Sequence, residues 1–288
     1  MADVKTTTTA VKNQTSVQPK KSSNSISWIA PLACIILGYV IWRFILGAES
    51  NFTNPDKTNW FWPDHKGLKP TAGMAKMYEG GIIVPILIGC FLTVITFVIE
   101  RFLTVGRARG TGSIGEFIRK VQFHLANKDV DKAIVECDKQ KGSVGNVMKS
   151  GLLTYKEMIT NHELSTEQKV LNIQKSVEET TALELPMLEK NLVFLSTIAS
   201  VATLLGLLGT VIGMIKSFSA LGDEGGGEAA RELSKGISEA LFNTALGIGT
   251  SAVAIIFYNM FTTKIDSVTF GIDESGFTLT QSFAANYK

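Results

Sequence analysis

The sequence has little of what a catalytic or metal centre needs. It contains three cysteines and three histidines, and no Ser/His/Asp, Cys/His or paired-carboxylate arrangement stands out among its 288 residues. The histidines lie far apart, without the spacing of metal ligands: His65, His124 and His162. We therefore expect no enzymatic activity, no metal and no cofactor.

Disulfides and nucleic acid are excluded on similar grounds. Three scattered cysteines do not make a disulfide framework: Cys34, Cys90 and Cys137. The net charge is only +2, and no basic patch carries interleaved aromatic residues, so we expect no nucleic-acid partner.

Charge is almost absent from four long apolar runs, although the chain as a whole is 19% charged. Each run reaches or approaches the roughly 20 residues that a helix needs to span a bilayer. They cover about 26–46, 81–99, 192–215 and 240–261. The fold class is therefore an all-α integral membrane protein with four transmembrane helices, a large cytoplasmic helical segment and long helices extending from the membrane.

The first run resembles the core of a secretory signal, because Lys20 and Lys21 precede it. The preceding leader is long, however, and no clear small-x-small cleavage site follows. We therefore favour an uncleaved membrane anchor.

Apolar residues recur at helical spacing through residues 100–190, and no strand-like alternation is present. From about Ser165 to Ser219 this pattern continues into the third span without a strong stop. It predicts one long helix, half in water and half in lipid, with Pro186 as a candidate kink.

Basic residues set the expected orientation. Arg101, Arg107 and Arg109 follow the second span, whereas the 219–235 loop is net acidic. Because basic residues favour the cytoplasmic side, we expect the large segment and both termini to be cytoplasmic.

The third and fourth spans each carry a stripe of small and hydroxyl residues at steps of three and four, which share one helix face. In the third span these are Ser196, Ala199, Thr203, Gly206, Thr210, Gly213 and Ser217, with Gly209 beside them. In the fourth they are Ala240, Thr244, Gly247, Ser251, Ala254 and Tyr258. Small residues allow close helix packing, and paired hydroxyls can also line a narrow polar conduit, so both interpretations stay open.

The spans contain almost no ionisable side chain. Glu239 lies at the predicted outer entrance of the fourth helix, and Arg43 lies near the end of the first. A proton path usually needs a titratable relay. Either the chain conducts no protons, or a partner supplies the acid.

Two ordered motifs resemble the MotA/TolQ/ExbB proton-channel family, and ExbB in particular. The first is LGLLGTVIGM over 205–214, and the second is GISEALFNTALG over 236–247. The resemblance implies a channel subunit in the bacterial inner membrane, forming a ring, typically a homopentamer, around an ExbD-like dimer that brings the membrane aspartate. By motif, Thr210 and Thr244 would face that aspartate, with Glu239 near the mouth of the path.

The implied output is mechanical: proton flow moves the partner helices, and a TonB-like protein passes this motion to outer-membrane import. The alternatives are a TolQ-like unit, a flagellar or gliding stator subunit, and a membrane scaffold that does not conduct. In that scaffold the stripes would only pack.

With this resemblance we expect the chain to divide into a disordered cytoplasmic tail (1–25), an extra N-terminal transmembrane helix (26–46), a periplasmic loop (48–79), a channel domain (80–265) and a cytoplasmic C-terminal tail (266–288). Within the channel domain we expect spans at 81–99, 191–217 and 237–262, with the cytoplasmic segment at 100–190.

Overall fold

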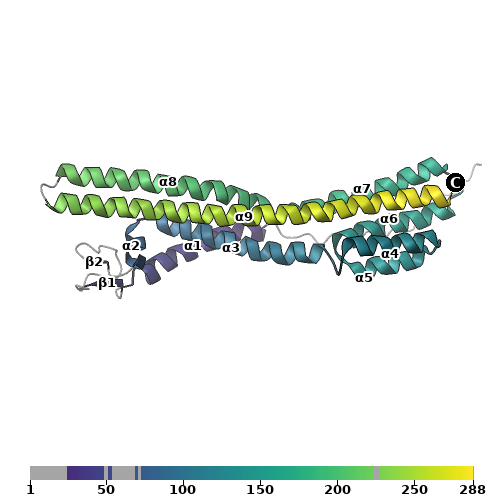
Figure 1. Cartoon of the computed structure of the whole chain (residues 1–288), viewed down its shortest axis with the longest axis horizontal. Coiled ribbons are helices and arrows are strands. Elements are labelled where there is room, and N and C mark those ends of the chain that lie inside the picture. Colours follow the sequence, from purple (N-terminus) through teal and green to yellow (C-terminus); the bar gives the residue numbers. More distant parts are fainter. Residues whose placement is uncertain (1–24, 49–50, 54–68, 71–72, 224–226, 288) are drawn as a thin grey trace, which may run out of the picture.

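The protein is a long rod in this computed structural model, which describes residues 25–48, 51–53, 69–70, 73–223 and 227–287 (Figure 1). The predicted N-terminal tail and most of the 48–79 loop lie outside the described residues. One end of the rod is the hairpin between the two longest helices, which we call the hairpin end. The other is a bundle of shorter helices, which we call the bundle end.

The described residues are almost entirely helical, which confirms the all-α fold class. The helices are α1 (Ser25–Ile41), the π-helix η1 (Trp42–Leu46), α2 (Gly73–Glu79), α3 (Ile83–Ala108), α4 (Ile114–Ala126), α5 (Val130–Gln140), α6 (Gly142–Thr160), α7 (Thr166–Glu189), α8 (Leu192–Asp223) and α9 (Gly227–Asn286). Two-residue strands β1 (Phe52–Thr53) and β2 (Lys69–Pro70) pair antiparallel, with Phe52 opposite Pro70.

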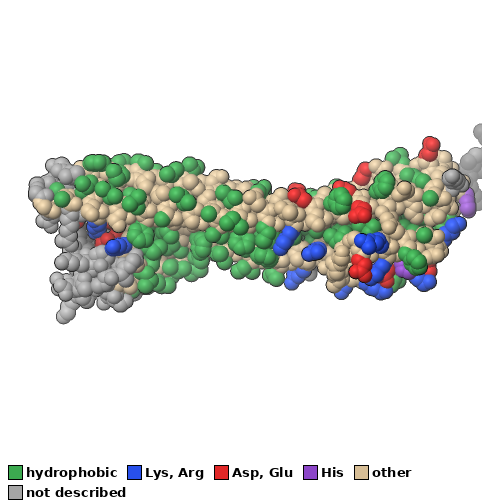
Figure 2. Space-filling view, in the orientation of Figure 1, with side chains coloured by type: hydrophobic (Ala, Val, Ile, Leu, Met, Phe, Trp, Pro, Cys, Tyr) green, Lys and Arg blue, Asp and Glu red, His purple; other side chains and the backbone are tan. Residues whose placement is uncertain are grey.

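Four helical stretches are long and apolar enough to cross a membrane, as the four apolar runs predict. Figure 2 shows hydrophobic side chains covering the half of the rod formed by α1, α3, α8 and the first part of α9. Charged side chains gather over the half formed by α4–α7. The apolar half is therefore the part suited to lipid, and we call it the membrane half.

The bundle end is held together by helix caps and a shared apolar core. The Asp129 side chain accepts a hydrogen bond from the Lys132 amide at the start of α5. Ser165 and Gln168 form a reciprocal capping box that starts α7. The fully buried core side chains come from α4, α6 and α7 and include Val121, Met148, Leu152 and Ile173.

The C-terminal residues expected as a tail are the last third of α9, and they pack on this core. Val268, Ile272, Leu279 and Phe283 are all buried. The Phe283 ring meets Tyr155 of α6 edge to face, with centroids 4.9 Å apart. One uninterrupted helix of 60 residues thus joins the hairpin end to the bundle end.

The single helix expected from Ser165 to Ser219 is divided in the structure. α7 ends at Glu189, and α8 begins at Leu192. Between them Asn191 adopts a left-handed backbone, with φ of 68°. The chain therefore has a joint between the bundle and the membrane half, five residues beyond Pro186.

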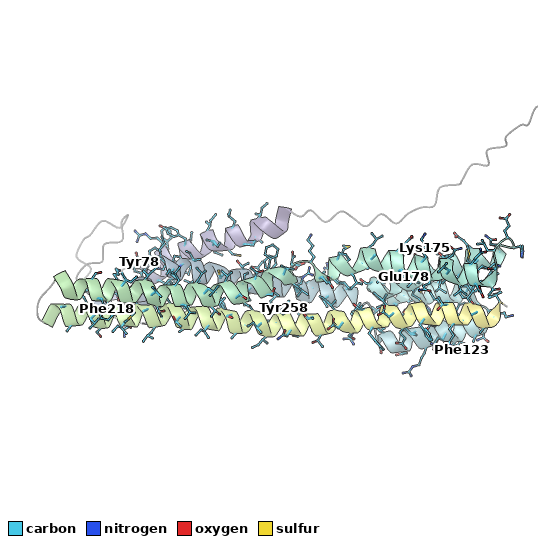
Figure 3. All side chains as sticks on the ribbon, turned by 90° about the horizontal axis from the view of Figure 1, so that it is seen from above. Tyr78, Phe123, Lys175, Glu178, Phe218 and Tyr258 are labelled. Carbon is cyan, nitrogen blue, oxygen red and sulfur yellow. The ribbon has the colours of Figure 1, made fainter. Side chains whose placement is uncertain are left out.

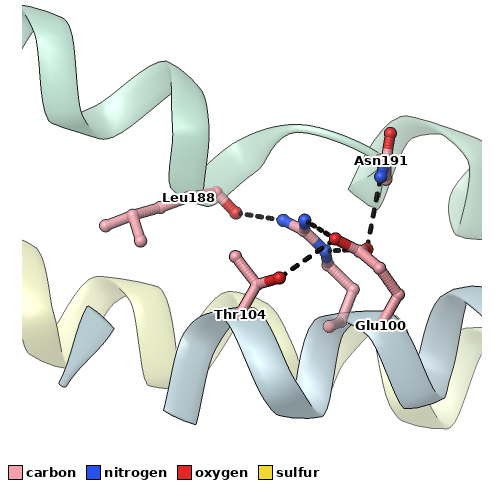
Figure 4. A network of polar contacts seen from close by, with 5 residues as sticks. Glu100, Thr104, Leu188 and Asn191 are labelled. Carbon is pink, nitrogen blue, oxygen red and sulfur yellow. Dashed lines mark hydrogen bonds and ion pairs between the residues drawn. The ribbon is translucent and has the colours of Figure 1, made fainter. Parts of the chain in front are cut away.

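A buried arginine from α3 holds this joint (Figure 4). Arg101 is 2% exposed and donates from Nη1 to the Leu188 carbonyl at 2.9 Å, at the end of α7. Its Nε and Nη2 donate to the Glu100 carboxylate, which also accepts from Asn191 Nδ2 at 3.2 Å. The carbonyl left free where α7 stops is thus capped by a side chain 87 residues away in sequence.

The added helix α1 lies along α3, away from the third and fourth spans. A Cβ at Gly38 would lie 2.6 Å from the Pro85 carbonyl oxygen, and one at Gly89 would lie 2.7 Å from Ile35 Cα. The two backbones touch because both positions are glycine. Beyond α1, the Trp42 ring stacks on Tyr78 of α2 with centroids 4.5 Å apart.

We expect Arg101→Met to weaken the joint. The substitution leaves the buried Leu188 carbonyl without its donor, which costs about 2 kcal/mol. Glu100 is less affected because its side chain is 40% exposed. Limited trypsin digestion should cleave the variant after Lys190 much faster than the wild type. Arg107→Met, an exposed arginine on the same helix, is the matched control, and equal cleavage in both variants would contradict the capping role.

We expect Cys137 to resist thiol reagents on either side of the membrane. The side chain is 2% exposed, and burial raises the pKa of its thiol to about 12, so almost no thiolate exists at pH 7.5. With Cys34→Ala and Cys90→Ala in the background, a maleimide should label it only after denaturation. Rapid labelling in lysed native membranes would mean that the bundle core is open. A topology reporter therefore belongs at an exposed position such as Glu163→Cys.

Candidate functional site

The centre of the membrane half is a seam where α8 and α9 touch backbone to backbone. A Cβ at Gly247 would lie 2.5 Å from the Ala202 carbonyl oxygen and 2.8 Å from Gly206 Cα. A Cβ at Gly206 would in turn lie 3.1 Å from Gly247 Cα. Only glycine fits at this contact, since the neighbouring atoms belong to backbone.

The same seam continues toward the hairpin end. A Cβ at Gly213 would lie 2.8 Å from the Ala240 Cβ, and one at Gly209 would lie 2.5 Å from the Asn243 Cβ. The glycines and alanines of the two stripes therefore pack α8 against α9 within one chain.

The two predicted path threonines lie within about one helical turn of each other along this seam. Thr244 donates its hydroxyl hydrogen to the Gly206 carbonyl at 2.9 Å. Gly206 lies one helical turn before Thr210. The Thr210 hydroxyl donates to the Leu207 carbonyl of its own helix at 2.6 Å and is only half-buried.

Four further stripe residues lie nearer the bundle end. Ala199 is 3% exposed and Ser251 is 8% exposed, so both are inside the packed structure. Ser196 and Thr203 are half-buried and donate to their own helix, at the carbonyls of Val193 and Ala199. The hydroxyls of Ser196 and Thr203 therefore lie at the edge of the seam and make no hydrogen bond across it.

A shallow, open groove lined by α8 alone follows this helix from Thr210 toward the hairpin end, with a volume of ≈ 660 Å³. Its walls are mostly apolar, with hydroxyls at Thr210 and Ser219. Phe218 lies in this wall, near the hairpin end of α8 (Figure 3). Thr210 is thus the one predicted path residue on this exposed face.

Glu239 lies at the hairpin end, where α2 meets α9. Its side chain is 8% exposed, and the charged groups that act on it are Lys216, Lys235, Glu79 and Glu232. Lys235 pairs with Glu79 at 3.0 Å and so links α9 to α2. Among the residues that the structure describes, none donates a hydrogen bond to the Glu239 carboxylate.

Asn243 belongs to this site although the sequence analysis gave it no role. It is 3% exposed and donates from Nδ2 to the Gly80 carbonyl at 3.0 Å. Its side-chain oxygen is buried and accepts no hydrogen bond from the described residues. Its place in the sequence could have indicated a role, because it is a polar amide inside a predicted span, one helical turn from Glu239.

Comparison with known proteins relates part of the chain to one family. Residues 140–274 match the sequence model of the MotA/TolQ/ExbB proton channel family. This part of the chain is therefore similar to that family. The match begins at the end of α5 and ends within α9, so it contains both stripes and Glu239.

Part of the chain is similar to proteins named ExbB, ExbB-like and TolQ. The chain is 39% identical over 88 residues to a putative biopolymer transport protein, ExbB-like 3, of Synechocystis, covering 30% of this chain and 41% of that protein. It is 36% identical over 86 residues to the Tol-Pal system protein TolQ of Haemophilus influenzae, covering 30% and 37%. It is 40% identical over 92 residues to the biopolymer transport protein ExbB of Helicobacter pylori, covering 32% and 62%. The chain thus spans less than two thirds of the length of each.

The seam predicts a contrast between two glycines of α9. Gly247→Ala should separate the helices, because the new Cβ meets backbone atoms, and should cost about 1–3 kcal/mol. Gly249→Ala should be neutral or slightly stabilising, since nothing lies within 4 Å of its Cβ position. Thermal unfolding in detergent, followed by circular dichroism, measures both. Equal melting temperatures for the two variants would rule out the backbone contact.

Proposed function

We propose that the chain is the ExbB-like channel subunit of a motor driven by the proton-motive force. It forms a homo-oligomeric ring, which we expect to be a pentamer, around an ExbD-like dimer. Proton flow through this complex energises a TonB-like protein and thereby outer-membrane transport.

The observation that carries the proposal is that the third and fourth spans offer threonine hydroxyls but no acidic side chain. Thr244 bonds the Gly206 carbonyl, one helical turn from Thr210, whereas residues 192–215 and 240–263 contain no Asp, Glu, His, Lys or Arg. Hydroxyls can pass a hydrogen bond along, but they do not store a proton near neutral pH. A proton crossing this level therefore needs an acid from a partner helix.

The groove beside Thr210 offers a place for that helix. Its apolar walls suit a partner span, and the Thr210 hydroxyl can accept a hydrogen bond from a protonated carboxyl group. Each proton that crosses 100 mV releases about 2.3 kcal/mol, so several protons per cycle can drive movement of the partner.

We place the complex in the bacterial inner membrane, with the bundle end and both termini in the cytoplasm. Arg107 and Arg109 support this orientation, because both follow the apolar part of α3 at the bundle end. The Glu163→Cys reporter tests it, since Glu163 lies exposed between α6 and α7.

We expect Thr210→Val and Thr244→Val to reduce proton flux while the complex stays assembled. Valine keeps the volume but removes the hydroxyl, and losing one hydrogen bond of about 1.4 kcal/mol from the path slows flux by about tenfold. The fold should tolerate both changes, since the carbonyls that these hydroxyls bond are ordinary helix acceptors. The measurement is proton uptake by liposomes that hold the purified complex.

Thr197→Val is the matched control, because Thr197 is exposed on α8 and its hydroxyl bonds only its own helix. Wild-type flux in both path variants, with the complex intact, would favour the non-conducting scaffold. A co-purifying protein with one N-terminal span and a membrane aspartate is the expected partner.

A TolQ-like role is the second candidate, supported by the 36% identity to TolQ of Haemophilus influenzae. The two roles differ in the protein that receives the motion. Cross-linking in cells distinguishes them: a TonB-like protein that cross-links to the complex supports import, and a Pal-associated system supports envelope maintenance. Capture by a flagellar or gliding apparatus would indicate a stator.

A further inference from the structure

The hairpin end contains a buried acceptor that nothing in the described chain satisfies. Asn243 is 3% exposed, and its Oδ1 has no hydrogen-bond partner. Buried amide oxygens are nearly always paired, with protein or with an ordered water. An unpaired oxygen at this depth therefore points to a small donor bound beside it.

The orientation of the Asn243 amide is fixed by its neighbours. Nδ2 donates to the Gly80 carbonyl at 3.0 Å, so exchanging the amide oxygen and nitrogen would set two oxygens against each other. On the other side Gly209 of α8 lies against the side chain, where a Cβ would be 3.0 Å from Nδ2. Three segments hold this residue: α8, α9 and the α2–α3 turn.

Gly80 packs tightly against one side of the unpaired oxygen. A Cβ at Gly80 would lie 3.1 Å from Asn243 Oδ1 and 2.6 Å from Val84 Cγ2, so this side has no room for another heavy atom. A donor therefore reaches Oδ1 from a side that Gly80 does not cover, and a side chain at Gly80 would press on the amide.

The next acceptor along α9 is Glu239, one helical turn toward the hairpin end. It is 8% exposed and lies in the field of Lys216 and of the Lys235–Glu79 pair. Residues four apart on a helix have Cβ atoms about 6 Å apart, so a single water can bridge two such side chains. Thr244 follows Asn243 directly in sequence.

We propose that Asn243 holds a buried water at its Oδ1, and that this water carries protons between Glu239 and the level of Thr210 and Thr244. This rests on the proposed function and names a positioning residue for it. The water donates one O–H to Oδ1 and keeps a lone pair toward Glu239. It accepts a proton from the Glu239 carboxylic acid and releases a different proton inward, so Asn243 itself is never protonated.

The test uses the full complex in liposomes with three variants. Asn243→Leu removes the acceptor at similar volume and should lower proton flux at least about tenfold. Gly80→Ala keeps the amide but sets a Cβ 3.1 Å from Oδ1, which presses the amide out of place, and it should lower flux even if Asn243→Leu fails to assemble. Asn259→Leu replaces an exposed asparagine on the same helix and should match the wild type.

A high-resolution map of the same complex provides the second readout. We expect water density within hydrogen-bond distance of Asn243 Oδ1 in the wild type, and none in Asn243→Leu with the helices unmoved. Wild-type flux in Gly80→Ala and in assembled Asn243→Leu would overturn the proposal. So would a partner side chain donating to Oδ1, or flux that disappears when choline replaces sodium, which would make the site a cation site. If the wild type itself passes no protons, the proposed function fails, and the map alone decides whether the water is there.

Discussion

The contact of backbone with backbone along α8 and α9 constrains everything else in the membrane half. Because Gly206 and Gly247 leave no gap between the helices, one helix cannot slide past the other without a clash. The register then fixes which groups share a level. Thr244 reaches the Gly206 carbonyl, and Asn243 fits against Gly209, only in this register. The positions of the polar side chains therefore depend on the packing, since the glycine contacts set the register of the two helices.

The two helices of this seam continue differently toward the bundle. α9 runs unbroken for 60 residues and packs its last third on α4, α6 and α7. α8 is joined to α7 at Asn191, where Arg101 supplies the cap. α9 is thus one continuous helix between the two ends, whereas α8 and α7 are separated by the joint. Lys175 and Glu178 of α7 lie beyond this joint, on the bundle side (Figure 3).

Sequence alone predicted the features that depend on local composition. Hydropathy located the four spans, and the three-four spacing located both stripes, because a helix face repeats at that interval. The joint at Asn191 was missed, since its cap comes from Arg101 on another helix. The packed end of α9 was missed too, although Val268, Ile272, Leu279 and Phe283 keep helical spacing. The unpaired oxygen of Asn243 becomes apparent only when Gly80 and Gly209 are placed around it.

The added helix α1 leads to the hairpin end of the apolar half without touching the seam. Its backbone is fixed on α3 at Gly38 and Gly89, and η1 then sets Trp42 on the Tyr78 ring. Tyr78 is followed by Glu79, which pairs with Lys235, and by Gly80, whose carbonyl holds Asn243. A continuous set of contacts thus runs from α1 through α2 to the two acceptors on α9. The position of α2, and with it the packing around Asn243, depends on a helix outside the residues that match the family.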